Sequence, residues 1–326
     1  MKIIVDAMGG DHAPQEIIEG AILAKNELKV DIIFVGKENL IKDYLKDKVN
    51  DFEIVNAEEV ITMDDKPILS FRKKKNSSIN VSLNLLKEGK GDAFFSCGNT
   101  GVILAASYFI LEKIPGINRP TQSAIIPTLK GLMVLVDAGA NIDANTNNII
   151  EWAQMAKIFL KLFTRKDKIN IGLLNIGEEE EKGTELTKES YKLLKEKFKD
   201  EFAGNMEGKD FLYGNYDLCI TDGFTGNIAL KTLEGEASLF LNLIKDIFKK
   251  NFFTKLSYLF VKKELINNLK RFDYEEYGGS PILGVNGIVV VGHGRSKRKS
   301  VKNGIKMTAK LVELDLINNL KLEKYQ

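Results

Sequence analysis

The chain has 326 residues, 44% hydrophobic and 28% charged, which is an ordinary composition for a globular protein with a substantial core. The formal net charge of +2 gives no overall field that would select nucleic acid, and we expect no nucleic-acid partner. No stretch is apolar enough to span a membrane or to act as a signal peptide, so we expect a cytoplasmic protein with reduced thiols.

Short apolar runs alternate with helical patterns over the first part of the chain. The runs predict strands at 2–6, 31–36 and 52–55, and the periodic segments predict helices at 15–25 and 38–45. This β-α-β-α-β order predicts a three-layer α/β/α fold with a mainly parallel sheet and helices on both faces. Ligands of such sheets bind at the carboxyl ends of the strands.

Six predicted strands each end in a loop rich in Gly, Asn, Asp or Thr. These loops follow the strands at 2–5, 93–96, 132–136, 169–175, 218–221 and 288–291. One such loop is a routine connection, but six at the edge of one sheet favour a phosphate-handling cleft. Cys97 and Cys219 also lie at strand ends, are not spaced as metal ligands and are expected to be small buried groups. With two histidines in the chain, we expect no metal site.

Two of these connections share a strand, a Thr-Gly turn and a helix. The first passes through Gly98-Asn-Thr-Gly101 into a predicted helix at 102–111. The second passes through a turn at 222–226 into a predicted helix from Asn227. Either one alone also fits an α/β connection without a ligand. Because free N–H groups at a helix start attract an anion, the pair suggests two walls of one anion-binding crevice.

A basic stretch at 68–78 precedes a predicted helix at 79–87. It contains Arg72 followed by three lysines, and it ends in a Ser-Ser pair that can cap the helix. Most charge runs are solvated loops. Cations in this position also fit an anionic ligand or an acidic carrier protein, and both interpretations stay open.

The segment 248–263 mixes lysine with aromatic and aliphatic residues and contains no acid. As a helix it would present Phe252, Phe253, Leu256, Leu259 and Phe260. This face either packs on the core or a dimer partner, or it contacts an anionic membrane surface, where each Lys contributes about 1 kcal/mol. Both hold if the segment lies at a dimer edge. No linker or repeat divides the chain, so we expect a single domain over 1–326 with a helical excursion at about 236–272.

Seven motifs occur together in this chain. They are Asp6-Ala-Met-Gly-Gly-Asp-His-Ala-Pro14, Ser96-Cys-Gly-Asn-Thr-Gly101, Asp137-Ala-Gly-Ala-Asn141, Thr221-Asp-Gly-Phe-Thr-Gly-Asn227, Leu230-Lys-Thr-Leu-Glu-Gly235, Tyr277-Gly-Gly and Gly292-His-Gly-Arg-Ser296. On these motifs the chain resembles the PlsX family of bacterial phosphate acyltransferases, from its first residues to about Ala309. Cys97 and Val102 each stand where the family's motif favours Ala, and both substitutions are small.

The resemblance implies a fold like that of isocitrate and isopropylmalate dehydrogenases and of phosphotransacetylases. It implies a homodimer, peripherally attached to the membrane, with no metal or nucleotide cofactor. In the implied reaction, a long-chain acyl group passes from acyl carrier protein to inorganic phosphate. The acyl phosphate then feeds a membrane glycerol-3-phosphate acyltransferase in phospholipid synthesis.

The motifs also imply site residues. For phosphate and substrate binding we expect Asn99, Thr100, Gly101, Asn141, Thr225, Gly226 and Asn227. Lys182 matches the family's Glu-x-x-Lys-Gly region and is expected to neutralise phosphate or the transition state. Asp222 and His293 are alternatives for proton transfer or orientation, and a structural role for His293 is equally compatible with its glycine turn. Because phosphate is the nucleophile, no acyl-enzyme is required.

Three alternatives stay open. A dehydrogenase of this fold class would need nicotinamide contacts, and the opening loop Met8-Gly-Gly-Asp lacks the Gly-x-Gly-x-x-Gly spacing. A short-chain phosphotransacetylase would use coenzyme A in place of the carrier protein. A membrane-recruited scaffold for lipid enzymes would bind vesicles without phosphate-dependent loss of a thioester.

Overall fold

The computed structural model describes residues 1–270 and 276–322. Its strands are β1 (Lys2–Asp6), β2 (Asp31–Gly36), β3 (Glu53–Asn56), β4 (Ala93–Ser96), β5 (Thr121–Thr128), β6 (Gly131–Val136), β7 (Ile171–Leu174), β8 (Phe202–Met206), β9 (Leu218–Ile220), β10 (Ser280–Leu283) and β11 (Ile288–Val291). Its α-helices are α1 (Gln15–Leu28), α2 (Glu38–Leu45), α3 (Pro67–Lys73), α4 (Ser78–Lys87), α5 (Thr100–Ala106), α6 (Thr146–Thr164), α7 (Glu185–Phe198), α8 (Gly223–Lys249), α9 (Phe252–Lys270), α10 (Arg298–Glu313) and α11 (Leu316–Leu322). The short helices are η1 (Lys46–Asp51), η2 (Ser107–Leu111), η3 (Lys199–Glu201) and η4 (Gly208–Asp210), of which η2 is a π-helix that continues α5.

The strands form one mixed sheet in the order β3-β2-β1-β4-β11-β10-β5-β6-β9-β7-β8. The prediction of a mainly parallel sheet is confirmed, since antiparallel pairs occur among the described strands only at the centre. There β10 is antiparallel to β11 and β5, and β5 is antiparallel to β6. The two halves of the sheet therefore run in opposite directions. This reversal was not expected, because no strand was predicted at 121–128.

This reversal corrects the expectation that all six glycine-containing loops leave one straight edge of the sheet. Loops after β1, β4 and β11 leave one half, and loops after β6, β7 and β9 leave the other half in the opposite sense. Adjacent strands rotate by about 20° to 25°, and this rotation accumulates across the sheet. Loops from both halves nevertheless line one cavity.

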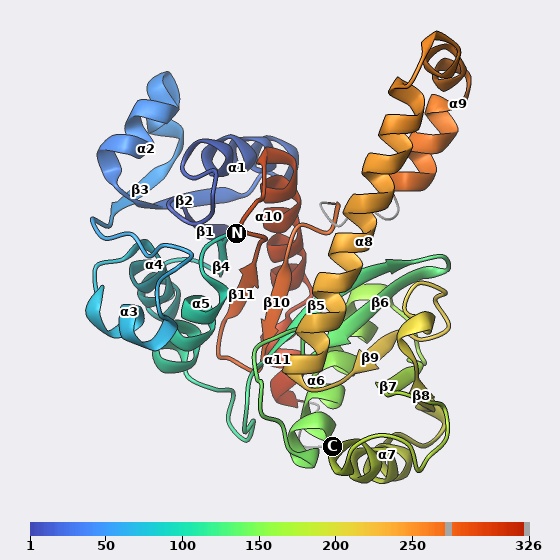
Figure 1. Cartoon of the computed structure of the whole chain (residues 1–326). Coiled ribbons are helices and arrows are strands. Elements are labelled where there is room, and N and C mark those ends of the chain that lie inside the picture. Colours follow the sequence, from blue (N-terminus) through green and yellow to red (C-terminus); the bar gives the residue numbers. More distant parts are fainter. Residues whose placement is uncertain (271–275, 323–326) are drawn as a thin grey trace.

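Helices cover both faces of the sheet, which makes the three expected layers (Figure 1). Alternate strand residues face alternate layers, as the pleat requires. Ile3 and Val5 of β1 belong to the core cluster that contains residues of α1, α6 and α10, whereas Ile4 packs with residues of α4 and α5. In the second half, Val134 and Val136 of β6 belong to the cluster that contains α6, whereas Leu135 faces the other side of the sheet, in a cluster that contacts α8.

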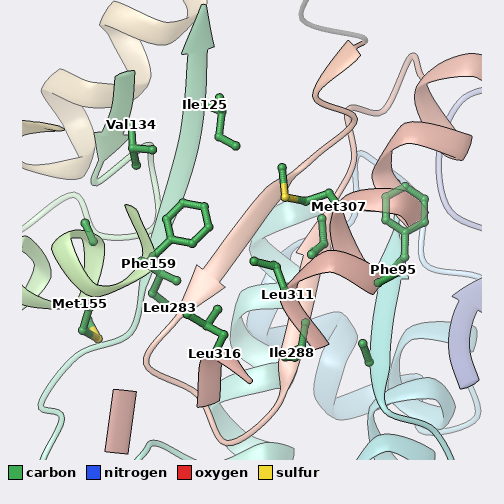
Figure 2. Packing of buried hydrophobic residues seen from close by; sticks show 14 of the residues in the cluster. Phe95, Ile125, Val134, Met155, Phe159, Leu283, Ile288, Met307, Leu311 and Leu316 are labelled. Atoms are coloured by element: carbon green, nitrogen blue, oxygen red, sulfur yellow. The ribbon is translucent and has the colours of Figure 1, made fainter. Parts of the chain in front are cut away.

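The antiparallel centre is sealed by apolar side chains that join the two halves of the molecule. Figure 2 shows Ile125 of β5 and Leu283 of β10 beside Phe159 of α6 and Met307 of α10. All four side chains are at most 8% exposed. Since interiors pack at crystal-like density, this contact fixes the relative position of the halves and of the strand ends they carry.

Helices α8 and α9 project from the body of the molecule (Figure 1). The segment 248–263 is divided between them, because α8 ends at Lys249 and α9 begins at Phe252. Asn251 caps the new helix by accepting a hydrogen bond from the N–H of Thr254 at 2.9 Å. The last part of the predicted excursion, 271–275, lies outside the described residues.

The C-terminal part of the described chain forms two helices. Helix α10 ends at Glu313, and α11 follows after Asp315, which has a φ of 51°. A left-handed residue of this kind ends a helix, because continuing the helix requires right-handed backbone. Within residues 1–270 and 276–322, none of the helices combines the length and apolar composition that crossing a bilayer requires.

Replacing Glu16 of α1 with glutamine should weaken the packing of α1 on α10 in a pH-dependent way. The Glu16 carboxylate accepts hydrogen bonds from Nη2 and the backbone N–H of Arg298, each at 2.7 Å. These bonds lower the pKa of Glu16 to about 2. A depressed folded-state pKa contributes stability above the unfolded value of about 4.3 that is lost as pH falls toward 2.

We therefore expect E16Q to lose about 1–2 kcal/mol of unfolding free energy at pH 7 and much less near pH 2. Urea unfolding of both proteins from pH 7 to pH 2 measures the difference. A destabilisation that stays constant over this range would contradict the assignment.

Candidate functional site

A cavity of about 820 Å³ lies where the two halves of the sheet meet α8. Five of the six predicted loops contribute to its wall. They are represented by Asp11, Thr100, Gly139, Asn227 and His293. The sixth, the loop after β7, contributes no lining residue among those described. Loops that follow strands far apart in the sequence therefore meet at one cavity, as expected for five of the six loops.

Buried Asp6 organises the first two of these loops. One carboxylate oxygen accepts the N–H of Met8 at 3.0 Å, and the other accepts the hydroxyl of Ser96 at 2.6 Å. The Ser96 oxygen in turn accepts the N–H of Gly98 at 3.0 Å. Burial raises the pKa of Asp6, although these hydrogen bonds oppose the rise. The carboxyl ties the loop after β1 to the loop after β4.

Asp137 performs the corresponding task in the second half of the sheet. Its Oδ1 accepts the N–H groups of Gly139 and Ala140 at 3.0 and 2.8 Å, and its Oδ2 accepts the amide of Asn141 at 2.7 Å. Burial raises the pKa of this carboxyl as well. Asn141, expected to bind substrate, also donates to the carbonyl of Pro120 at 2.9 Å, and it does not line the cavity. Its amide is used in shaping the loop.

The start of α5 is held by Asn99, another residue that was expected to bind substrate. Its side-chain oxygen accepts the N–H of Val102 at 3.1 Å, and its amide donates to the carbonyls of Met63 and Asp65 at 2.9 and 3.1 Å. Thr100 and Gly101 follow, and both line the cavity. Asn99 therefore positions the cavity wall, while Thr100 and Gly101 form it.

The start of α8 differs from the expectation. The helix begins at Gly223 and not at Asn227, and Asp222 is its cap. The Asp222 carboxylate accepts both the N–H and the hydroxyl of Thr225, at 2.9 and 2.7 Å, and the N–H of Gly226 donates to the Asp222 carbonyl at 2.9 Å. The N–H groups of Thr225 and Gly226 are thus satisfied internally. Asn227 lines the cavity, whereas the predicted site residues of the turn itself, Asp222, Thr225 and Gly226, do not.

Gly226 is required for the close approach of α8 to the loop after β6. A Cβ at this position would lie 1.9 Å from the carbonyl oxygen of Asp137. Gly226→Ala should therefore displace α8, lower the unfolding free energy by about 1–3 kcal/mol and reduce activity.

Gly235 of the same helix provides the control, because a Cβ there meets nothing within 4 Å. Gly235→Ala should leave stability unchanged or raise it by up to about 1 kcal/mol. Thermal unfolding of both variants measures the contrast. Equal stability of the two alanine variants would show that the approach at Gly226 can relax.

His293 lies in the cavity wall, on the loop after β11. Its Nδ1 accepts the backbone N–H of Arg295 at 3.2 Å, so the ring's other nitrogen carries a proton. That nitrogen, Nε2, faces a carboxylate oxygen of Glu234 on α8 at 3.7 Å. The pKa of Glu234 lies below its ordinary value. Burial raises this pKa, but the hydrogen bonds and electrostatic interactions with His293 and Lys231 together lower it by more than burial raises it. Glu234 is thus an anion that orients the imidazole.

The cavity also contains cations that the sequence analysis did not select. Lys231 lies 2.9 Å from Glu234, which neutralises it. Arg295 lines the same wall, is exposed, and has no carboxylate within ion-pair distance among the described residues. Arg295 belongs to the Gly292-His-Gly-Arg-Ser296 motif, the same motif that contains His293. Both side chains line the cavity, so the motif could have indicated Arg295 as well as His293.

Lys182 lies on the loop after β7, outside the cavity wall. Its side chain is exposed, and its carbonyl accepts the amide of Asn175 at 3.1 Å. The loop is tied to β8 and to the segment after it, where Asn205 donates to the carbonyl of Glu179 at 2.8 Å and Lys209 pairs with Glu178 at 3.6 Å. A role for Lys182 in phosphate binding stays a prediction.

The far part of the cavity is apolar. Helix α8 contributes a stripe at helical spacing, which consists of Leu230, Leu233, Ala237, Leu241 and Ile244. Strand β5 faces it with Ala124, Ile126 and Pro127. The cavity therefore has a polar end, at His293 and Thr100, and an apolar extension between α8 and β5.

Neither of the two cysteines lines the cavity. Both cysteines are buried, and burial raises the pKa of Cys97 to about 12 and that of Cys219 still more strongly, so neither supplies a thiolate at neutral pH. Within residues 1–270 and 276–322, no three or more His, Cys, Asp or Glu side chains gather in a way that could hold a metal ion.

Comparisons with solved structures find the same fold in phosphotransacylases and in a dehydrogenase. A phosphotransacetylase from Streptococcus pyogenes matches with a TM-score of 0.61 at 17% identity, over 96% of this chain and 94% of that one. A branched-chain phosphotransacylase from Enterococcus faecalis gives 0.59 at 14% identity, over 96% and 99%. A putative 4-hydroxythreonine-4-phosphate dehydrogenase from Salmonella typhimurium gives 0.54 at 14%, over 95% and 99%. These similarities support the expected dehydrogenase-like fold.

Sequence comparisons are more specific. A family model described as "Fatty acid synthesis protein" matches residues 1–319. Phosphate acyltransferases from Thermoanaerobacterium thermosaccharolyticum and Carboxydothermus hydrogenoformans are 42% and 44% identical, over 99% and 98% of this chain and 96% and 97% of theirs. The expected resemblance is confirmed, and the chain belongs to the family of the phosphate acyltransferases, the PlsX family.

Proposed function

We propose that this chain transfers a long-chain acyl group from the thioester of acyl carrier protein to inorganic phosphate. The observation that carries the proposal is the two-part cavity, whose polar end suits phosphate and whose apolar extension suits an alkyl chain. Its volume of about 820 Å³ lies within the range of sites that enclose small ligands. Family membership supports an acyltransferase with phosphate as acceptor.

In this reaction a phosphate oxygen attacks the thioester carbon, the carbon–sulfur bond breaks and the carrier leaves as a thiolate. The main barrier arises from holding an anion beside the thioester and from charge that develops on the carbonyl oxygen. The hydroxyl of Thr100 and the amide of Asn227 are side-chain donors at the cavity for these charges, and the imidazole of His293, oriented by Glu234, lies in the same wall. Arg295 supplies a compensating positive charge for phosphate.

The test is to incubate the purified protein with palmitoyl-acyl carrier protein, with and without phosphate, and to trap acyl phosphate with hydroxylamine. We expect phosphate-dependent formation of palmitoyl hydroxamate. Replacing the substrate with acetyl-coenzyme A separates this activity from that of a short-chain phosphotransacetylase, and we expect little product from it. Thioester loss that does not depend on phosphate would overturn the proposal.

Arg295→Ala should raise KM for phosphate by about 10- to 100-fold with a smaller change in KM for the acyl donor. Charge-assisted bonds to phosphate contribute about 1.5–3 kcal/mol, and Arg295 has no competing carboxylate partner in the described chain. Steady-state kinetics with varied phosphate measure the effect. Lys182→Ala, assayed in parallel, reports whether the exposed lysine adds to phosphate binding, and an unchanged phosphate KM in Arg295→Ala would remove the guanidinium from the site.

We further propose peripheral contact with an anionic membrane through α9, in a homodimer that delivers acyl phosphate to a membrane glycerol-3-phosphate acyltransferase. The support is an apolar stripe that the single chain leaves open, with Phe252, Phe253, Leu259 and Phe260 between 67% and 82% exposed. Leu256 lies on the same stripe. Glutamate at Phe252, Phe253 and Leu256 should release the protein from anionic vesicles in flotation assays, and unchanged retention would identify the stripe as a packing surface.

A further inference from the structure

Helix α3 packs against α5 (Figure 1). The amide of Asn99 donates to the carbonyls of Met63 and Asp65, which precede α3. Pro67, in the first turn of α3, packs so closely on Gly101 that a Cβ on Gly101 would lie 2.7 Å from its ring. Because Met63 and Gly101 line the cavity, the position of α3 is coupled to the cavity wall.

The outer face of α3 combines exposed apolar side chains with cations. Ile68 and Leu69 are 56% and 48% exposed, and Arg72 and Lys73 are exposed one turn later. At 100° per residue these four positions fall within about 140° of the helix surface, so they form one face. The inner side chain Phe71 is buried and stacks on Phe109 at 5.4 Å, which orients this face outward.

The charges of this face are not neutralised within the described part of the chain. Lys74 is paired with Asp65 at 2.6 Å. By contrast Lys66, Arg72 and Lys73 have no carboxylate within ion-pair distance among the described residues, and α3 contains no acid. The exposed Asp64 is the nearby acid in the preceding loop. The surface therefore keeps net positive charge next to the cavity.

We infer that this α3 face (Lys66, Ile68, Leu69, Arg72 and Lys73) is the docking surface for an acidic, helical carrier protein that delivers the acyl thioester. The inference rests on the proposed function. Unpaired cations steer an acidic partner toward the surface, and apolar side chains between them provide contact area once it arrives. The cavity wall adjoining α3 lets a carrier bound there present its thioester while the protein body stays outside.

The double charge reversal Arg72→Glu/Lys73→Glu tests this inference. Its matched control is Lys192→Glu/Lys197→Glu on α7, which makes the same change in net charge at exposed lysines outside the cavity wall. Rates are measured with palmitoyl-acyl carrier protein and with palmitoyl-N-acetylcysteamine, a thioester that lacks the carrier. The α3 variant should raise KM for the carrier substrate at least tenfold and leave kinetics with the small thioester within twofold, while the α7 variant changes neither.

Fluorescence anisotropy with labelled carrier protein measures docking without turnover. We expect wild-type binding to weaken between 50 and 200 mM salt and the α3 variant to bind at least tenfold more weakly at low salt. Carrier binding that depends on α3 without acyl phosphate production would refute the proposed function and retain the docking surface. Unchanged carrier affinity in the variant would overturn the inference, as would a loss of binding to anionic vesicles without a loss of carrier binding, which would identify a lipid surface.

Discussion

Replacing His293 with alanine should lower kcat/KM for acyl phosphate formation by about 10²- to 10⁴-fold, the range that a positioned proton donor or acceptor contributes. His293 lies in the cavity wall, its Nδ1 is occupied by the N–H of Arg295, and its Nε2–H is directed by anionic Glu234. The imidazole is therefore held in one tautomer and one orientation, as a preorganised donor must be.

Two further variants separate the possible roles of this histidine. Glutamine at position 293 retains an N–H donor, so a substantial recovery of activity over alanine would indicate hydrogen bonding to the developing charge. Glu234→Gln removes the orienting carboxylate and should lower kcat by about tenfold with little change in either KM. His12→Ala controls for the loss of a histidine, because His12 is exposed and outside the cavity wall.

The measurement is initial-rate kinetics together with thermal unfolding of each variant. All four proteins should unfold within a few degrees of wild type, since His293 and His12 lie outside the buried core. Near-normal turnover in His293→Ala would assign the residue a structural role in the glycine turn after β11.

The sequence was sufficient to predict the parallel parts of the fold. The strands at 2–6 and 31–36 are continuous apolar runs, and the structure places them side by side in β1 and β2. Local pattern was enough there, because each strand is buried on both faces and each is followed by a helix.

The centre of the sheet could not be predicted in the same way. In strand β5 the apolar run is limited to Ala124, Ile125 and Ile126, between the polar pair Gln122-Ser123 and Pro127. The strand is held on one side by β6, which follows it in the chain and pairs over Ser123 to Thr128, and on the other side by β10, from more than 150 residues further along. Only the position of β5 beside β10, and with it the reversal at the centre of the sheet, depends on a contact between distant parts of the chain.

The same distinction explains the site. The motifs indicated Asn99 and Asn141 for substrate binding and Asp222 for proton transfer or orientation, yet each has polar atoms engaged in holding a loop or capping a helix. Asn and Asp serve such local bonds as readily as they bind ligands, and sequence alone does not separate the two uses. Glu234 and Ala237 were missed because they look like ordinary helix residues until α8 is laid against β5.

Replacing Ala237 with tryptophan should make the enzyme selective against long acyl chains. Ala237 lies at the middle of the apolar stripe of α8, between Leu233 and Leu241, and faces the part of the cavity bounded by β5. An indole there would occupy the volume of about four methylene groups of the bound chain. At about 0.8 kcal/mol for each, the palmitoyl donor should lose about 3 kcal/mol, or about 10²-fold in kcat/KM.

A butyryl donor ends before the obstruction if the reacting end of the chain lies near His293, so its kcat/KM should change by less than threefold. Ser238→Trp is the matched control, because Ser238 is the next residue of α8, is exposed and does not line the cavity. Kinetics with carrier-bound donors of four to sixteen carbons measure the profile for both variants. A uniform loss across all chain lengths in Ala237→Trp would mean that the helix has shifted, and an unchanged palmitoyl rate would mean that the alkyl chain does not lie between α8 and β5.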